Sequence, residues 1–360
     1  MHNDTFFIKK TFDLAKKAEG NVSPNPLVGA IIVKEGRIVG SGYHKRAGLV
    51  HAEIEAINKV KVSLENSTLY VNLEPCCHWG RTPPCVDRII SSRIKRVVIS
   101  TLDPNPLVYG RSVRKLKKAG IEVKVGVLRK EAIKLNEVFF KNMKETRPFV
   151  VVKFAQSLDG KIATKLGVSK WISSPSSRNF SKKLRDKYDA VLVGVDTVIK
   201  DNPNLEGINK SPYKIVIDPY LRIPLNCNLI NKFKDKLIIF TSSKKHMTIS
   251  TLNKLGIKIF TLSLKGGYFR IKDILKILYQ HNITSVFVEG GSITIGRFFD
   301  EKLVDKLYIF LAPLIIGGKE SLPSIGGEGI SYLNEATKLK DLEITRIGED
   351  LLISGYPQFR

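Results

Sequence analysis

One cluster of residues constrains the fold of this chain more than any other feature: His51–Glu53 (HAE) and, downstream, Glu74–Cys85 (EPCCHWGRTPPC). Three of the chain's four cysteines, Cys76, Cys77 and Cys85, lie in the second segment. A secreted scaffold spreads paired cysteines along its chain, whereas clustered cysteines are typical of metal binding or catalysis. The two segments therefore predict a metal site that the fold assembles from separate elements.

His51, Cys76 and Cys85 match the ligand set of a catalytic zinc ion, which takes three protein ligands and leaves one position for water. Zn2+ lowers the pKa of that water, so a nucleophile is available at neutral pH. Glu53 lies two residues after the histidine and can transfer the proton of this water to a departing amino nitrogen. The pattern H-x-E…P-C…C is that of zinc nucleobase deaminases, in which the glutamate is not a ligand.

Each of these residues also has a purely structural alternative. A single histidine at a helix start is more often a cap, and a single cysteine is more often a buried core residue. Their coincidence at two helix starts and one strand end favours zinc. Cys77 is adjacent to Cys76 and would point another way, which predicts a buried non-ligand, and His78 is a rival ligand to Cys85.

Strand-like and helix-like segments alternate through the first half of the chain. The N-terminal segment reads as a helix, and residues 27–44 read as a hairpin with Glu35-Gly36 at the turn. Further strands are expected at 67–75, 96–104 and 121–126, and helices at 51–60, 85–94, 113–120 and 131–148. This order predicts a sheet with helices packed on it. The last helix ends near residue 147, which predicts domains 1–147 and 148–360.

The second half of the chain repeats this alternation. Strand-like segments are 149–160, 189–197, 213–219, 236–243, 257–263, 284–291 and 306–313, and helical segments include 176–188 and 291–307. The alternation predicts a second α/β domain with mostly parallel strand pairing. One strand ends in Gly290-Gly291, directly before a helix. Such a turn can hold a phosphate at the helix start, and its alternative is only a tight turn.

The formal net charge of +25 is compatible with nucleic-acid binding. The charge is spread over both halves without a basic tail, which favours a generally basic surface that suits small anionic substrates. No apolar run approaches the ~20 residues that span a bilayer, and the N-terminus lacks the layout of a signal peptide. We expect a cytoplasmic enzyme without nucleic-acid or membrane partners. The sequence leaves the oligomeric state open, a homo-oligomer included.

Beyond the metal motif, the chain resembles the bifunctional deaminase–reductases of riboflavin biosynthesis along nearly its whole length. The block EPCCHWGRTPPC is specific to that family, because Cys76 and Cys85 are far apart where other deaminases have C-x-x-C. The other matching blocks are NPLVG (25–29), GYH (42–44), DPNP (103–106), VKFAQSLDGKIAT (152–164), SKWIS (169–173), GVDTVIKDNPNL (194–205) and VEGGSITIGRF (288–298). The resemblance implies an α/β fold class, with a cytidine-deaminase-like three-layer α/β/α domain followed by a dihydrofolate-reductase-like α/β domain.

The resemblance also implies two consecutive reactions. Zn2+-dependent hydrolytic deamination of 2,5-diamino-6-(5-phosphoribosylamino)pyrimidin-4-one, a small phosphorylated pyrimidine, precedes NADPH-dependent reduction of the ribosyl side chain to ribityl. Asn25 and His44 match positions near the pyrimidine, and their structural alternatives are a turn and a strand end. The loop at residues 79–82 is expected to close over the substrate, with Arg81 or Lys45 on the phosphate.

In the second domain the resemblance implies two sets of contacts. The cofactor-contacting positions are Ala155, Trp171, Thr197, Asp201, Gly291, Ser292, Ile293, Thr294, Ile295, Gly296 and Arg297. The substrate-contacting positions are Ser169, Arg185, Leu205 and Glu289. Lys153 is expected near the reacting ribose, with Asp201 and Glu289 as acidic neighbours. Without the resemblance, Arg185 would be a helix-surface charge, and Lys153, a polar residue in an apolar strand, is either at the sheet edge or functional.

Two features depart from the family pattern. After Leu205 the family continues with Thr-Val-Arg, whose arginine meets the substrate phosphate, whereas this chain has a shortened loop in which Lys210 or Lys214 could substitute. Pro219 replaces a hydroxyl residue that would contact the cofactor. The shortened loop supports one rival function, a deaminase beside an inactive reductase-like module. The net charge supports another, a nucleic-acid-editing deaminase with a basic RNA-binding C-terminal domain.

Overall fold

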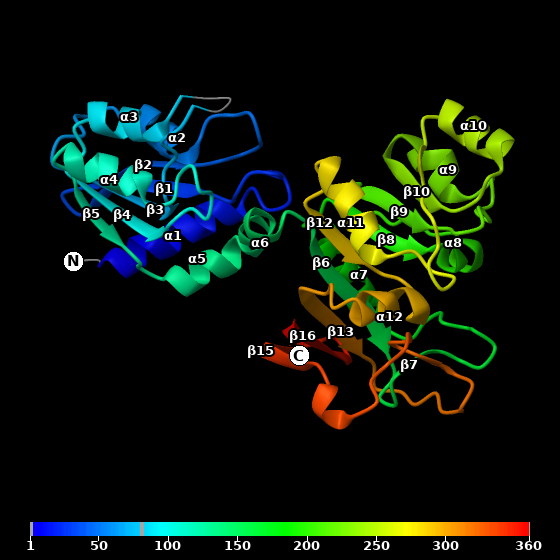
Figure 1. Cartoon of the computed structure of the whole chain (residues 1–360). Coiled ribbons are helices and arrows are strands. Elements are labelled where there is room, and N and C mark those ends of the chain that lie inside the picture. Colours follow the sequence, from blue (N-terminus) through cyan, green and yellow to red (C-terminus); the bar gives the residue numbers. More distant parts are fainter. Residues whose placement is uncertain (1–2, 80–82, 360) are drawn as a thin grey trace. The chain divides into compact units, whose positions relative to one another are not determined.

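A computed structural model describes residues 3–79 and 83–359 of the chain (Figure 1). The chain forms two compact units, Met1–Thr146 and Arg147–Arg360. Among the described residues, no helix combines the length and the apolar character needed to cross a membrane.

A five-stranded sheet of order β2-β1-β3-β4-β5 forms the centre of the first unit. Its strands are β1 (Gly29–Lys34), β2 (Arg37–Tyr43), β3 (Thr68–Leu73), β4 (Arg96–Thr101) and β5 (Glu122–Val125). β1 is antiparallel to β2 and β3, whereas β3, β4 and β5 run parallel. The predicted hairpin turn is confirmed, because Glu35 and Gly36 both have the positive φ of a tight two-residue turn.

Helices cover both faces of this sheet and give three layers. α1 (Asp4–Lys16) packs on β1 and β3, and α5 (Arg129–Leu135) packs on β4. On the other face, α2 (Ala52–Asn58) packs on β1 and β2, with α3 (Cys85–Ser91) beside α2 and α4 (Arg111–Lys118) beside α3. Successive strand residues face opposite cores, as Ile31 on the α1 side and Ile32 on the α2 side illustrate.

The segment 131–148, predicted as one helix, forms parts of two: α5 and then α6 (Glu137–Glu145). The break falls at Asn136, whose amide oxygen accepts the N–H of Leu27 at 2.7 Å and whose amide nitrogen donates to the Leu27 carbonyl at 3.0 Å. The single-helix prediction was wrong because this contact is made with a distant segment. The apolar pattern itself continues through both helices and gives no sign of the interruption.

A nine-stranded sheet forms the centre of the described second unit, in the order β11-β10-β9-β8-β12-β6-β13-β16-β15. Its strands are β6 (Phe149–Gln156), β8 (Ala190–Gly194), β9 (Tyr213–Ile217), β10 (Leu237–Thr241), β11 (Lys258–Thr261), β12 (Ser285–Val288), β13 (Lys306–Leu311), β15 (Lys338–Ile347) and β16 (Asp350–Gln358). The strands from β11 to β13 pair in parallel, which confirms the predicted pairing. β7 (Lys161–Ala163) and β14 (Leu322–Pro323) form a separate antiparallel pair.

The helices of the second unit pack around a core of buried strand residues. α11 (Ile271–Gln280) and α12 (Ser292–Asp300) contribute to one large apolar cluster that also contains Val150 and Ile215. α7 (Pro175–Arg185) contacts the sheet through Phe180, whose ring lies 6.2 Å from that of Phe310. The remaining helices are α8 (Val195–Asp201), α9 (Asn228–Phe233), α10 (His246–Lys254) and the short 3-10 helices η1 (Lys234–Lys236) and η2 (Leu333–Glu335).

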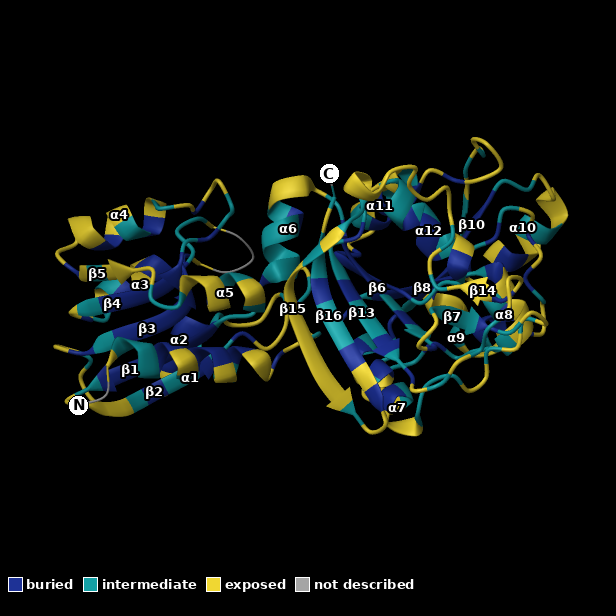
Figure 2. Cartoon of the chain, turned by 90° about the horizontal axis from the view of Figure 1, so that it is seen from below, coloured by how far each residue is buried: buried dark blue, intermediate teal, exposed yellow. Residues whose placement is uncertain are grey.

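The sheet of the second unit differs in burial from its centre to its end. β8 and β12 are almost entirely buried, whereas β15 at the edge is exposed along nearly its whole length (Figure 2). β15 and β16 pair antiparallel and follow the last predicted strand. Buried parallel strands therefore form the part of the sheet whose ends carry the candidate site residues.

Candidate active sites

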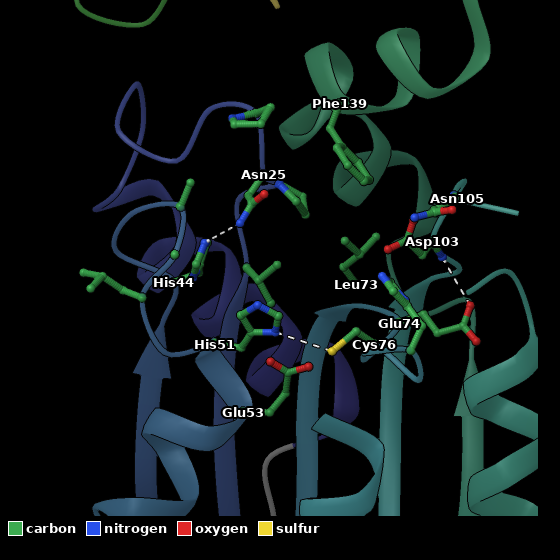
Figure 3. A pocket seen from close by; sticks show the side chains of 17 residues that line it. Asn25, His44, His51, Glu53, Leu73, Glu74, Cys76, Asp103, Asn105 and Phe139 are labelled. Atoms are coloured by element: carbon green, nitrogen blue, oxygen red, sulfur yellow. Dashed lines mark hydrogen bonds between the residues drawn. The ribbon is translucent and has the colours of Figure 1, made fainter. Parts of the chain in front are cut away.

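The three predicted metal ligands meet at one edge of the first unit's sheet, and Figure 3 shows two of them, His51 and Cys76. His51 directly precedes α2, Cys76 follows the end of β3, and Cys85 is the first residue of α3. Their ligand atoms all lie within 4.8 Å of one another. His51 Nδ1 lies 3.1 Å from Cys85 Sγ and 3.5 Å from Cys76 Sγ. Two sulfurs and one imidazole in this arrangement form a donor set that fits Zn2+.

The environment of the cluster favours ionisation of Cys76. The thiol of Cys85, the ring of His51 and the backbone N–H of Cys85 all face its sulfur, the last at 3.3 Å, and together they lower the pKa of Cys76. The same interaction with Cys76 raises the pKa of His51. The thiolate is the form that binds metals, so this geometry favours capture of a divalent cation.

Glu53 lies in the first turn of α2 and is 3% exposed. Burial, together with the negative charge of nearby Cys76, raises the pKa of this carboxyl to about 7. A group with a pKa near the working pH can both accept and donate a proton, which suits a general acid–base residue. The carboxyl also lines the cavity beside His51 and Cys76, as expected of a proton carrier that is not a ligand.

The two residues that follow Cys76 in the sequence do not join the metal cluster. The Sγ of Cys77 lies 3.6 Å from the carbonyl oxygen of Leu107, away from the ligands, and the side chain packs against the core. His78 lines the cavity instead, and among the described residues its buried Nδ1 atom has no hydrogen-bond partner. The geometry therefore favours Cys85 over His78 as the third ligand.

A cavity of about 350 Å³ opens above the cluster, and Asn25 and His44 lie on its wall. The Asn25 amide nitrogen lies 3.0 Å from His44 Nε2, and His44 Nδ1 lies 3.2 Å from the carbonyl oxygen of Val50. These partners fit a neutral imidazole that accepts from Asn25 and donates to Val50. Burial lowers the pKa of His44, which also favours the neutral ring. The two predicted substrate residues thus form one hydrogen-bonded unit.

Other cavity residues were not identified from the sequence. Asp103 and Asn105 follow β4, and Phe139 comes from α6. Asp103 is 8% exposed, and burial raises the pKa of its carboxyl to about 7. The sequence held a signal for the first two, because polar residues after β4 must lie near Cys76 after the parallel neighbour β3.

Two residues were suggested as phosphate contacts in this unit. Lys45 Nζ is paired with Glu55 Oε1 at 3.0 Å, so its charge is already partly compensated. Arg81 and Thr82 lie outside the described residues. Trp79 is described, and its side chain is 76% exposed at the start of that loop.

In the second unit, Lys153, Arg185 and Glu289 come together at the carboxyl end of the sheet. Lys153 lies on β6, between β12 and β13, so it is not an edge-strand residue. Glu289 Oε2 accepts from Arg185 Nε at 2.6 Å, and Glu289 Oε1 lies 3.6 Å from Lys153 Nζ. Burial opposes ionisation of Glu289, but Arg185 and Lys153 outweigh it and lower its pKa. Burial also lowers the pKa of Lys153.

The predicted cofactor segment forms the start of α12, with Gly291 as its N-cap. A Cβ atom at Gly290 would lie 2.6 Å from Thr294 Cβ, so the helix start packs too closely on the strand end for any other residue. The first-turn amides of a helix have no intrahelical acceptor and suit a phosphate. Ile293 is exposed at this end, which leaves the first turn open to a ligand.

The later positions of this segment face elsewhere. Ile295 is fully buried in the core, and a Cβ at Gly296 would lie 2.2 Å from the backbone of Gly326. The Arg297 guanidinium lies 3.4 Å from both Asp300 and Glu328. Ile295, Gly296 and Arg297 therefore contribute to the packing of α12, whereas Gly291, Ser292, Ile293 and Thr294 lie at its open first turn.

One ion pair joins Asp201 to the loop that carries Ser169 and Trp171. Lys170 Nζ lies 3.7 Å from Asp201 Oδ1, which places the loop before α7 beside the end of α8. The exposed Trp171 ring stacks on the guanidinium of Arg178 at 4.2 Å. The Asp201 carboxylate thus pairs with Lys170, whereas Lys153 pairs with Glu289.

Three further predicted positions lie on neighbouring elements. Ala155 is half-buried on β6 opposite Phe310 of β13, and Thr197 is half-buried in α8. Leu205 is 4% exposed and has a positive φ of 54°, at the start of the shortened loop. The Arg185 Nη1 atom donates to the carbonyl oxygen of Glu206 at 2.9 Å, so this loop lies against the ion cluster.

The shortened loop is held by a carboxylate. Asp186 accepts the backbone N–H groups of Ile208, Asn209 and Lys210 at 2.9–3.2 Å. Lys214 is fully buried, donates to the Pro212 carbonyl at 2.7 Å and has its pKa lowered to about 8 by burial. Lys214 therefore does not replace the missing phosphate-binding arginine, because its ammonium group is enclosed by the protein.

Pro219 has no hydroxyl to offer a cofactor, and its backbone carbonyl is bonded within the protein. Its carbonyl oxygen accepts from the N–H of Ser242 at 2.9 Å and from the hydroxyl of Ser242 at 2.7 Å. The hydroxyl of Ser242, which follows the neighbouring strand β10, is thus engaged by the backbone at Pro219.

Comparison with known proteins agrees with this division. Residues 148–353 match the family described as the RibD C-terminal domain, and residues 1–101 match the cytidine and deoxycytidylate deaminase zinc-binding region. The riboflavin biosynthesis protein RibD of Aquifex aeolicus (strain VF5) is 47% identical over 354 residues, which cover 97% of each chain. RibD of Escherichia coli (strain K12) is 34% identical over 370 residues, which cover 97% of this chain and 98% of the relative.

Solved structures show the same similarity over the whole chain. Acinetobacter baumannii RibD, form 1, superposes with a TM-score of 0.88 at 32% identity and 99% coverage of both chains. A Thermotoga maritima diaminohydroxyphosphoribosylaminopyrimidine deaminase/5-amino-6-(5-phosphoribosylamino)uracil reductase superposes with a TM-score of 0.85 at 36% identity, again with 99% coverage of both.

The fold and the site thus define a two-domain enzyme, a deaminase of the zinc-binding type followed by an α/β reductase. The chain belongs to the RibD family of riboflavin biosynthesis proteins. This membership confirms the predicted fold class, with a cytidine-deaminase-like first domain and a dihydrofolate-reductase-like second domain. It also confirms the prediction of a bifunctional enzyme.

Proposed function

We propose that residues 1–147 hydrolyse the amino group of 2,5-diamino-6-(5-phosphoribosylamino)pyrimidin-4-one and that residues 148–360 then use NADPH to reduce the ribosyl side chain to ribityl. The observation that carries the first reaction is the position of His51, Glu53 and Cys76 on one cavity of about 350 Å³. A cavity of this size is within the range of small-molecule sites and suits a pyrimidine base.

In the deaminase, His51, Cys76 and Cys85 are the residues that would hold Zn2+. The bound ion supplies a water molecule that ionises at neutral pH. Glu53 accepts a proton at its carboxyl and releases it to the departing amino nitrogen, a task for which its pKa of about 7 is suited.

The pyrimidine ring needs partners that fix its orientation above Glu53. The Asn25–His44 pair and the Asp103 carboxyl present hydrogen-bonding groups to the cavity. Because both Asn25 and His44 are held by each other and by Val50, they can orient the ring without first ordering their own side chains.

In the reductase, the start of α12 would hold a phosphate of NADPH through the amides of Ser292–Thr294. The bound cofactor supplies the hydride. Arg185 would meet the substrate phosphate, because a planar guanidinium suits phosphate oxygens. The same guanidinium also contacts Glu289 and the shortened loop, which fix its position. Lys153 would lie beside the reacting ribose, with its ammonium group oriented by Glu289.

Removal of the metal tests the deaminase assignment. We expect purified protein to contain about one zinc per chain, because one catalytic ion takes three protein ligands. Chelation should stop ammonia release from the pyrimidine, and added Zn2+ should restore it. Reduction of the already deaminated substrate should continue in the chelated enzyme. Ammonia release at the same rate from zinc-depleted protein would contradict the proposal.

A further inference from the structure

Glu74 is a buried carboxylate that directly follows β3, two residues before Cys76, and it is 3% exposed. Its Oε2 atom accepts the N–H of Gly110 at 2.9 Å and the N–H of Asp103 at 3.3 Å. Its Oε1 atom accepts the N–H of Ser112 at 3.1 Å and that of Val113 at 3.3 Å. One carboxylate therefore satisfies four backbone donors from two places in the chain (Figure 3 shows the bond to Asp103).

Two of these donors lie at the ends of the loop that joins β4 to α4, and the other two lie in the first turn of α4. Asp103 begins the loop, and Gly110 ends it as the N-cap of α4. Within the loop, Asp103 Oδ1 accepts the N–H of Asn105 at 2.8 Å, and the Asn105 carbonyl accepts the N–H of Tyr109 at 2.8 Å. The loop is thus an ordered unit whose ends are both attached to Glu74.

The same unit is attached to the turn that carries the metal ligand. The Glu74 N–H donates to the Thr101 carbonyl at 2.9 Å, and the Ser112 hydroxyl donates to the Pro75 carbonyl. The Cys76 carbonyl in turn accepts the N–H of Val86 in α3 at 3.2 Å. Movement of the loop relative to Cys76 therefore requires loss of several buried hydrogen bonds.

The first-turn amides of a helix have no intrahelical acceptor, and they carry the positive end of the helix dipole. A carboxylate compensates both, and its two oxygens are acceptors only. A glutamine at the same position would keep the shape but turn an NH2 group toward two N–H donors. The charge and the acceptor-only character of Glu74 thus both matter for closing this loop.

We propose that Glu74 is a positioning residue for substrate binding by the deaminase, because it holds Asp103 and Asn105 on the cavity wall at a fixed place relative to Cys76. The inference rests on the proposed deaminase function. Glu74 itself offers no free carboxylate oxygen to the substrate, since both oxygens accept hydrogen bonds from backbone N–H groups. It acts through the two residues that the loop presents.

The test compares E74Q with the wild-type full chain. We expect E74Q to raise the KM for the pyrimidine in deamination about tenfold, with a smaller change in kcat, because the ligands and Glu53 keep their own supports. Zinc content and the rate of reduction of the deaminated substrate should stay at wild-type values. The matched control is D159N in the other unit, whose carboxylate also accepts two loop N–H groups, from Ile316 and Gly317. D159N should leave the deaminase KM unchanged.

A purely structural role for Glu74 predicts a different result, namely a lower unfolding temperature with wild-type KM and kcat, and that result overturns the proposal. If E74Q yields no folded protein, the KM of E74D for the pyrimidine, compared with that of the wild type, decides instead. It keeps the charge but is one methylene too short to reach all four donors, and a wild-type KM would again overturn the proposal. Failure of the proposed function is a separate outcome, in which the wild-type enzyme itself releases no ammonia.

Discussion

The two candidate sites are assembled in different ways. In the first unit, two ligands and Glu74 come from one short segment, and the third ligand and Glu53 begin a single helix. In the second unit, the ion cluster joins three separate elements, and 104 residues separate Arg185 from Glu289. A local motif can therefore specify chemistry before the fold is known, whereas a cluster built by strand pairing becomes visible only in the fold.

The sites also differ in the charge they present. The first gathers ionisable sulfurs and buried carboxyls around a cavity, an arrangement that attracts a cation. The second gathers two cations around one carboxylate, which leaves a net positive site that suits a phosphorylated substrate. If this contrast is correct, changes at the two sites should affect the two reactions separately.

The largest separation is expected for Glu53→Gln. Loss of the proton carrier should lower kcat for deamination by about 10²–10⁴-fold, the usual contribution of a general acid–base group. Zinc should stay bound, because Glu53 is not a ligand, and reduction of the deaminated substrate should be unaffected. Ammonia release and metal content measured on the same sample test both statements. Deamination at the wild-type rate would show that the proton is carried by another group.

Glu289→Ala should impair the reductase and leave the deaminase active. It leaves Lys153 and Arg185 facing each other without the buried carboxylate, which should destabilise the second unit by about 3–5 kcal/mol and reduce reductase activity strongly. Deamination should continue as long as the first unit stays folded. Thermal unfolding and NADPH oxidation are the measurements.

The matched control for this variant is Asp273→Ala, which removes the carboxylate of an exposed pair with Arg270 at 4.0 Å. Such surface pairs contribute about 0–1 kcal/mol, so this change should be small. Equal losses of stability in the two variants would mean that the Glu289 cluster is not a buried charge network.

A smaller loss of stability is expected from a change at Asn136, the residue that separates α5 from α6. Asn136→Ala removes two hydrogen bonds to Leu27, close in the chain to the cavity residue Asn25. We expect a loss of about 1–3 kcal/mol in the free energy of unfolding, since the Leu27 N–H would lose its partner, whereas the Leu27 carbonyl would keep the amide of Asn72. The KM for deamination should rise a few-fold, with the reductase unchanged. Wild-type KM in the variant would show that the Asn25 segment is held by other contacts.

The smallest effect is expected from a pair remote from both sites. Arg96 donates two hydrogen bonds to Asp4, at 2.8 and 2.9 Å, and with Lys124 it holds the pKa of Asp4 well below its usual range. Asp4→Asn should destabilise the first unit by about 1 kcal/mol at pH 7, because partly exposed pairs are screened by solvent. Both activities should be unchanged.

The pH dependence of this difference follows from the depressed pKa. Stability from Asp4 is fully present above the ordinary carboxyl pKa of about 4 and is lost as the pH falls through the lower folded-state value. The gap between wild type and Asp4→Asn should therefore narrow below about pH 4. Unfolding free energies measured across pH test this, and a gap that widens on acidification would contradict the assignment.

The two sites also differ in how far their residues could be predicted from the sequence. His51, Cys76 and Cys85 could be predicted because helix starts and a strand end are signalled by local residues, and parallel neighbours place their ends at one edge. The four donors to Glu74 could not, because they are backbone N–H groups, which every residue carries. For Lys214 the sequence was misleading instead. A lysine close to the shortened loop suggested a phosphate contact, but Lys214 lies on β9 and is fully buried.

A two-step assay on one preparation of the full chain tests most directly whether the protein carries both active sites. The diaminopyrimidinone phosphate is supplied with and without NADPH, and ammonia release and NADPH oxidation are followed separately. We expect ammonia release in both samples and NADPH oxidation that begins only after deaminated product has formed. Ammonia release with no NADPH oxidation would contradict the claim that both sites are active and would favour an inactive reductase-like module.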